Sequence, residues 1–542
     1  MSNLSQVIDT YYRAWFRFFP EVAVDLGIEG YAEKLRPYGE DERGALIVLH
    51  EKLLSTLEEL DESDLSEDQQ IDLALMRGRV LLDMKDLNEC DWRVRDPGRY
   101  LPVHAIYQLT VRPVADPKAA FTARLQAIPD YLRGARAQLK QQPEQIPSIW
   151  LESAVTEATQ GAIYFRSLEQ HPQLARYGLA GLLEEAAHAL EDYARFLELD
   201  LAPLARGSFA RGLDYYNMLL THRHHLDVDA NTLHKFGEQL FEKTLRELYE
   251  VTRRLRGDEN VPAMAASLQA KSAANTDLIS TYREVMQAAK QFVIDKQLVS
   301  IPAKEELLVV ETPIFLQHQI PFAAYLDPAP NDPDQQGHYY VTPAKGEKPG
   351  EHNQISLQHT CVHEAWPGHH LQFVTANLSH TSNTLPRLLN ASATLYEGWA
   401  LYSEQLMHEQ GFLSAPESAF VLLKDRLWRA LRVMIDVEIQ TRGLSVSMAA
   451  ERMQSLLGFS RGEAMAELSW YSQAPGVPMG YAVGWALINA TRERLKSVEK
   501  DFNLKQFHDQ LLSAGSVALP FVIRRRFGKP LWESVRREVF NK

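Results

Sequence analysis

The stretch Cys361–Gln372, CVHEAWPGHHLQ, holds residues that can bind a metal ion, and it begins like the zinc-peptidase motif HExxH. In that motif two histidines one helical turn apart bind zinc, and the glutamate between them activates a water molecule. Here Pro367 stands four residues after His363, where the second histidine belongs, and the next histidines are His369 and His370. On a straight helix His370 would lie about 10 Å along the axis from His363. That is too far for one zinc ion with bonds of about 2 Å.

Pro367 and Gly368 can remove this objection. Proline has no N–H for the carbonyl of His363, and its ring clashes with that carbonyl, so the helix has to kink or bulge. Gly368 can supply the backbone angles that the distortion needs. A distortion at residues 366–369 can therefore bring His369 or His370 back toward His363, and the spacing leaves both choices open.

Two other interpretations of this stretch compete with a distorted metal site. His359 and His363 have the regular four-residue spacing and would share one face of an undistorted helix. A pair of histidines near a glutamate is also common as a surface or packing feature. The stretch alone leaves metal binding and packing equally open.

A third ligand is available in the segment Ala393–Leu406, ATLYEGWALYSEQL, which has helical character. Glu397 and Glu404 lie seven residues apart and share one face of that helix. In zincins of the glutamate-ligand type the third ligand is a glutamate on the helix after the HE helix. A carboxylate in the apolar, aromatic surroundings of Glu397 is costly unless it is paired or metal-bound. Alone, Glu397 is better explained as an exposed or capping helix glutamate. Together, the two segments predict a zinc site.

The elements that must position these residues are mostly helices. Apolar residues recur at steps of three and four, with charges between them, in Ala45–Leu60, Leu182–Leu201 and Asn231–Arg256. This is the pattern of helices with one buried face. The metal-binding stretch lies in a helix predicted over Ile355–Asn377.

One region breaks the helical pattern just before the metal-binding stretch. Glu306–Leu316 and Pro321–Pro343 are β-prone and rich in proline, and the second contains the β-former run HYYVT. We therefore predict a mainly α fold with one small β-sheet beside the metal-binding helix. A boundary near residue 300 would separate an N-terminal helical region (residues 1–300) that covers the cleft from a catalytic region (residues 301–542). No flexible linker marks this boundary, and one continuous fold is the alternative.

Composition narrows the classes of function and location. The chain has 542 residues, 45% hydrophobic and 24% charged, which is ordinary for a globular protein. A net charge of −14 argues against a nucleic-acid partner. Two cysteines, Cys90 and Cys361, cannot form a disulfide framework. The first residues are typical of an amphipathic helix and not of a signal peptide, and no stretch approaches the roughly 20 apolar residues of a membrane span. We expect a cytoplasmic protein without a membrane partner.

The two motifs also resemble those of a known protein family. The chain resembles the bacterial DUF885 family, placed among the zincin-like metallopeptidases, whose hallmark motifs are HEAxPGHHLQ and EGWALYxE. Softer matches at Phe19–Gly30, at Phe196–Leu220 and at GHYYVTP extend the resemblance over nearly the whole chain. It implies a large multi-helix fold of the gluzincin type and a zinc hydrolase, in particular a peptidase.

Carried over residue by residue, the resemblance places His363 and His369 on zinc, with Glu397 as the third ligand. It makes Glu364 the general base. His359 does not match the family's usual residue, so the resemblance implies that its regular spacing from His363 is accidental.

The resemblance extends to residues around the ligands. His370 and Glu404 would orient ligands or substrate. The segment PGVPMGYAVGW matches a late family segment and makes Tyr481 a candidate donor to the oxyanion, although a core tyrosine is an equal interpretation. In one place the chain departs from the family: where a DxGxH pattern is usual, Asp436 is followed by Gln440 in place of the histidine. The departure puts substrate and rate in doubt, but not the zinc site.

These residues predict a zinc-dependent hydrolase that cleaves short peptides, with Glu364 as general base. HYYVT is a candidate edge strand that would hold an extended peptide, with Tyr339 and Tyr340 near the substrate. Two alternatives stay open, namely an amidohydrolase acting on a small non-peptide amide and a catalytically silent peptide-binding scaffold. Retention of the general base argues against the scaffold. The sequence does not predict the oligomeric state.

Overall fold

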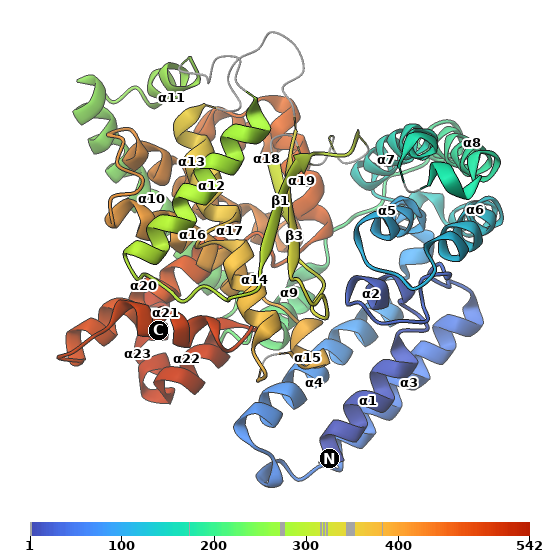
Figure 1. Ribbon diagram of the computed structural model, residues 1–542, viewed down its shortest axis with the longest axis horizontal. Coiled ribbons are helices and arrows are strands. Elements are labelled where there is room, and N and C mark those ends of the chain that lie inside the picture. Colours follow the sequence, from blue (N-terminus) through green and yellow to red (C-terminus); the bar gives the residue numbers. More distant parts are fainter. Residues whose placement is uncertain are drawn as a thin grey trace.

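In the part of the chain that the computed structural model describes, helices predominate and one small sheet lies among them (Figure 1). The structure describes residues 3–172, 174–270, 277–314, 317, 320, 323–342, 353–381 and 383–541. The mainly α fold with one small sheet is therefore confirmed.

The helices before the sheet are α1 (Asn3–Trp15), α2 (Pro20–Asp25), α3 (Glu40–Glu58), α4 (Glu67–Glu89), α5 (Val103–Val111), α6 (Pro117–Leu139), α7 (Ser148–Ser167), α8 (Ala180–Phe196), α9 (Gly212–His222), α10 (Ala230–Arg256), α11 (Val261–Gln269) and α12 (Leu278–Asp295). The helices after the sheet are α13 (Gln354–Glu364), α14 (His369–Leu378), α15 (Leu385–Leu388), α16 (Ala393–Glu409), α17 (Ser418–Thr441), α18 (Val446–Leu457), α19 (Arg461–Gln473), α20 (Gly480–Val498), α21 (Leu504–Leu512), α22 (Leu519–Phe527) and α23 (Lys529–Phe540). None of the helices in the described part of the chain has both the length and the apolar composition needed to cross a bilayer.

The sheet has three strands, β1 (Glu306–Glu311), β2 (Ala323–Leu326) and β3 (Gln336–Val341), in the order β1-β3-β2. β1 runs parallel to β3, and β2 runs antiparallel to it. The prediction that HYYVT forms an edge strand is wrong, because β3 is hydrogen-bonded on both sides. Residues 315–316, 318–319, 321–322 and 343 of the predicted β-prone region lie outside the described residues.

The two faces of the sheet pack against different groups of helices, which explains why β3 suits the centre. Tyr339 and Val309 belong to a core with α12, α13 and α16 on one side of the sheet. Tyr340 belongs to a second core on the other side, formed with α5–α8, and Val310 packs against it (Figure 1). Successive side chains of a strand point to opposite faces, so the neighbouring residues Tyr339 and Tyr340 are buried on opposite faces of the sheet.

The core around the metal-binding helix α13 includes side chains from both sides of residue 300. Tyr216 of α9 and Met286 of α12 pack in it together with Trp399 of α16 and Leu487 of α20. The division of the chain near residue 300 stays a prediction.

Candidate metal centre

The predicted metal-binding helix is interrupted in the middle of its motif. α13 ends at Glu364 and α14 begins at His369, so the single helix expected over Ile355–Asn377 is two helices. The peptide bond before Pro367 is cis. The predicted distortion at residues 366–369 is confirmed, and it is a complete break.

Gly368 is required at the break because the chain passes very close to itself. A Cβ atom on Gly368 would lie 1.8 Å from the carbonyl oxygen of His363 and 2.4 Å from that of Val362. The break is fixed to α16 as well, because the buried indole N–H of Trp399 donates to the carbonyl oxygen of Pro367 at 2.7 Å.

The break brings three candidate ligands together. The Nε2 atom of His369 lies 3.3 Å from Oε2 of Glu397, and Nε2 of His363 lies 3.7 Å from the same oxygen. The ligand atoms of all three residues lie within 4.8 Å of one another. The three side chains are nearly closed off from solvent, with exposed fractions of 7%, 7% and 9% for His363, His369 and Glu397.

This arrangement fits a zinc ion better than it fits a hydrogen-bonded cluster. Oε2 of Glu397 is buried and makes no hydrogen bond with acceptable geometry to a described residue, although two imidazole nitrogens face it. Ligand atoms bound tetrahedrally at about 2.0–2.1 Å are separated by about 3.3 Å from one another. The observed 3.3 and 3.7 Å are close to that spacing. Two imidazoles and one carboxylate are also a common ligand set of catalytic zinc.

The charges of the three groups are strongly coupled. Burial alone would lower the pKa of His363, but the carboxylates of Glu397 and Glu404 outweigh it and raise this pKa to about 10. Burial would raise the pKa of Glu397, but His369 and His363 hold it well below its usual range. The site therefore favours a positive charge, which a metal cation supplies in place of a proton.

Glu404 holds His363 in the orientation that a ligand needs. Its Oε1 accepts a hydrogen bond from Nδ1 of His363 at 2.8 Å, which leaves Nε2 directed toward Glu397. Carboxylate–histidine pairs of this kind fix the ring and its tautomer. The other oxygen of Glu404 lies 3.3 Å from Nδ1 of His359. His359 thus contacts Glu404 and not the ligand group, as its poor match to the family implies.

His370 is held by contacts outside the group of candidate ligands, which favours His369 as the second ligand. Its Nε2 is 2.7 Å from Oε2 of Glu305, and its Nδ1 is 3.0 Å from the hydroxyl of Tyr325 on β2. Both ring nitrogens of this fully buried histidine are therefore occupied. Sequence reasoning did not single out Tyr325, because it belongs to no recognisable motif. Its ring nevertheless stacks on that of His369, with the ring centroids 6.4 Å apart.

Glu364 and Tyr481 lie beside the ligands. Glu364 is the last residue of α13, and burial raises the pKa of its carboxyl group. The Tyr481 ring stacks on that of His363, with centroids 6.3 Å apart and planes 15° apart. Burial raises the pKa of Tyr481, and the neighbouring Glu397 carboxylate adds to the shift. The guanidinium of Arg432 lies 4.5 Å from the centre of the Tyr481 ring.

Close packing of α16 against α20 places Tyr481 next to Glu397. A Cβ atom on Gly398 would lie 2.4 Å from Cα of Gly484, so the two helices touch backbone to backbone at this point. Any side chain at either position would separate the helix that carries the Glu397 ligand from the helix that carries Tyr481.

Three other residues considered in the sequence lie outside the ligand group. Tyr339 and Tyr340 are buried core residues on opposite faces of β3. Gln440, where the family pattern has histidine, accepts a hydrogen bond from the backbone N–H of Arg211 and donates one to the carbonyl of Tyr471. Its side-chain amide therefore links the start of α9 to the last turn of α19.

Comparison with known proteins agrees with the family suggested by the motifs. The family model described as "Bacterial protein of unknown function (DUF885)" matches residues 20–525. The chain therefore belongs to the DUF885 family. No curated protein matches it.

Two solved structures share the fold. A "putative lipoprotein of unknown function" from Shewanella oneidensis matches with a TM-score of 0.76 and 22% identity, over 97% of this chain and 100% of that one. A "putative lipoprotein" from Colwellia psychrerythraea matches with a TM-score of 0.78 and 17% identity, over 99% of both chains. At a TM-score of 0.42 and 14% identity, the M32 carboxypeptidase of Deinococcus radiodurans R1 is too distant for its activity to be transferred. The cytoplasmic location of this chain stays a prediction.

Proposed function

We propose that the protein is a zinc-dependent hydrolase that cleaves peptide bonds of short peptides. The observation that carries this proposal is the convergence of His363, His369 and Glu397 on one point, with Glu364 directly after the first ligand. The three ligands are almost completely enclosed. A folded protein could not bring its backbone to them, whereas a short, flexible peptide could.

Each neighbouring residue has a chemical task in this proposal. Zinc, when bound, lowers the pKa of a water molecule and polarises the substrate carbonyl. Glu364 accepts the proton of the attacking water and passes it to the leaving amine nitrogen. Its raised pKa suits a group that has to take up a proton near neutral pH.

Tyr481 and Glu404 complete the arrangement. The Tyr481 hydroxyl donates a hydrogen bond to the oxygen on which negative charge develops. Burial keeps this hydroxyl protonated, since its pKa is raised. Glu404 keeps the His363 ring in place through the Nδ1 hydrogen bond.

Hydrolysis of a mixture of short peptides, followed by mass spectrometry, tests the proposal. We expect cleavage by the zinc-loaded protein, loss of cleavage with a chelator and recovery with added zinc. Glu364→Gln should keep zinc and the fold but lose cleavage by about 100- to 10,000-fold. The exposed Glu144 provides a matched control, and Glu144→Gln should cleave normally.

Three results would contradict the proposal. Cleavage that is insensitive to the chelator or to Glu364→Gln would exclude the mechanism. Hydrolysis of small non-peptide amides without peptide cleavage would identify an amidohydrolase instead. Peptide binding without hydrolysis of either class, with zinc present, would identify a binding scaffold.

A further inference from the structure

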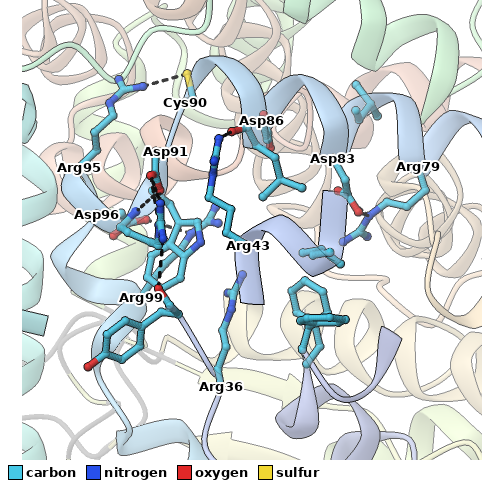
Figure 2. A pocket seen from close by; sticks show the side chains of 18 of the residues that line it. Arg36, Arg43, Arg79, Asp83, Asp86, Cys90, Asp91, Arg95, Asp96 and Arg99 are labelled. Carbon is cyan, nitrogen blue, oxygen red and sulfur yellow. Dashed lines mark hydrogen bonds and ion pairs between the residues drawn. The ribbon is translucent and has the colours of Figure 1, made fainter. Parts of the chain in front are cut away.

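A cavity of about 530 Å³ lies in the N-terminal half of the molecule, outside the group of metal ligands (Figure 2). It is lined by residues of α1, α2, α3 and α4, by the turns around Asp91–Arg99, by α9 with the residues that flank it, and by the loop 473–477. That loop leads into α20, and Tyr481 is the second residue of this helix. The cavity has the size of a small-ligand site.

The lining carries an excess of positive charge in a chain whose net charge is −14. It includes eight arginines and five acidic residues. Five of the arginines form ion pairs with carboxylates, namely Arg43, Arg79, Arg93, Arg99 and Arg211. Arg95 donates instead to Cys90 and to the carbonyl of Ser208. The other two arginines of the lining, Arg36 and Arg223, have no such partner among the described residues.

Arg36 presents a guanidinium that is held rigidly but not neutralised. It is stacked between the rings of Phe19 and Trp92, 4.8 and 4.7 Å from their centres. Its guanidinium forms no hydrogen bond or ion pair with any described residue, and Figure 2 shows it among the labelled side chains without a dashed line. Stacking leaves the N–H groups at the edge of the plane free to bind a planar anion with two hydrogen bonds.

Arg223 lies at the side of the cavity that approaches the metal centre. Its guanidinium also has no partner among the described residues, and its Nε is buried without a hydrogen bond. The next residue, His224, is hydrogen-bonded at 2.9 Å to Ser392, the residue that caps the start of α16.

Arg36 and Arg223 are both half-buried, and a charged group that loses part of its water without gaining a partner is costly. Two such groups line one cavity, and the loop before α20 forms part of its wall. We propose that this cavity binds a carboxylate of the substrate, with Arg36 and Arg223 as its anchors. The inference rests on the proposed peptidase function, and the carboxylate comes from either the peptide C-terminus or an acidic side chain.

Matched peptide pairs test the proposal by binding and by turnover. The first pair is tetraalanine with a free C-terminus and its C-terminal amide. The second is an N-acetylated, C-amidated peptide that contains either glutamate or glutamine. Calorimetry on zinc-loaded Glu364→Gln protein measures binding without hydrolysis, and kcat/KM on the wild type measures use of the same peptides.

We expect one charged peptide to bind at least about 10-fold more tightly than its neutral partner, since hydrogen bonds to charged groups have roughly that effect. Preference for the free acid identifies the C-terminal carboxylate, and preference for glutamate identifies a side chain. Arg36→Gln and Arg223→Gln should each reduce the preference about 10- to 100-fold. Arg99→Gln is the control, because Arg99 lines the same cavity but pairs with Asp96.

Equal binding of charged and neutral peptides by the wild type would overturn the proposal, and so would an unchanged preference in both arginine variants. Circular dichroism checks that each variant folds. If a glutamine variant does not fold, Arg36→Lys or Arg223→Lys takes its place in the same binding measurement. Because binding is measured on a non-hydrolysing variant, a failure of the proposed peptidase function would not hide the result.

Discussion

Replacing Gly368 with alanine tests how the broken helix builds the metal site. The new Cβ would lie 1.8 Å from the carbonyl oxygen of His363, and atoms of this kind do not approach closer than 3.0 Å. Residue 368 and residue 363 must therefore separate by about 1.2 Å. Zinc ligands tolerate displacements of only about 0.2 Å. One of the two histidines is then lost as a ligand, and the zinc Kd should rise at least about 100-fold, which corresponds to about 3 kcal/mol.

Competition with a chromophoric chelator measures that Kd, and circular dichroism reports whether the helices persist. Gly181→Ala is the matched control, because a Cβ at Gly181 in α8 would meet nothing within 4 Å. It should bind zinc normally. If folded Gly368→Ala protein binds zinc as tightly as the wild type, the close passage at the break does not position His369, and the reasoning is refuted.

Of His359, His369 and His370, only His369 should empty the zinc site when replaced by alanine, while His359→Ala and His370→Ala keep one zinc per chain. Metal analysis of the three purified variants decides this, and a filled His369→Ala protein would contradict it. Glu404→Gln should weaken zinc binding about 10- to 100-fold through misorientation of its histidine partner, and an unchanged Kd would exclude that role. Burial raises the pKa of Asp436 to about 7. The stability that protonated Asp436 provides is therefore present below about pH 4 and lost as pH rises toward 7, by at most about 4 kcal/mol. In denaturant titrations Asp436→Asn should lose this decline, and parallel pH profiles would show that Asp436 does not cause it.

The residue types in the two motifs predicted the centre of the site because the chemistry of zinc restricts them. Histidine, histidine and glutamate are needed as ligands, and Pro367 announces that the helix cannot continue. Spacing alone could not choose between His369 and His370. The contacts of His370 with Glu305, 65 residues earlier in the chain, and with Tyr325 favour His369, and neither contact follows from local pattern.

The helical fold was predictable from apolar periodicity, but the order of the strands was not. HYYVT reads as a strand in any position, and only the packing of helices on both faces of the sheet makes β3 central. The arginine-lined cavity also escaped notice. Its unpaired members, Arg36 and Arg223, are almost 190 residues apart in sequence, and each reads locally as an ordinary surface arginine.

The central claim is that His363, His369 and Glu397 hold one zinc ion. Anomalous diffraction from crystals of the zinc-loaded protein, recorded on both sides of the zinc absorption edge, tests it most directly. We predict one peak at about 2.0–2.2 Å from Nε2 of both histidines and from the Glu397 carboxylate. A peak coordinated by His359 or His370, or a crystal of zinc-loaded protein with no peak at these three residues, would contradict it.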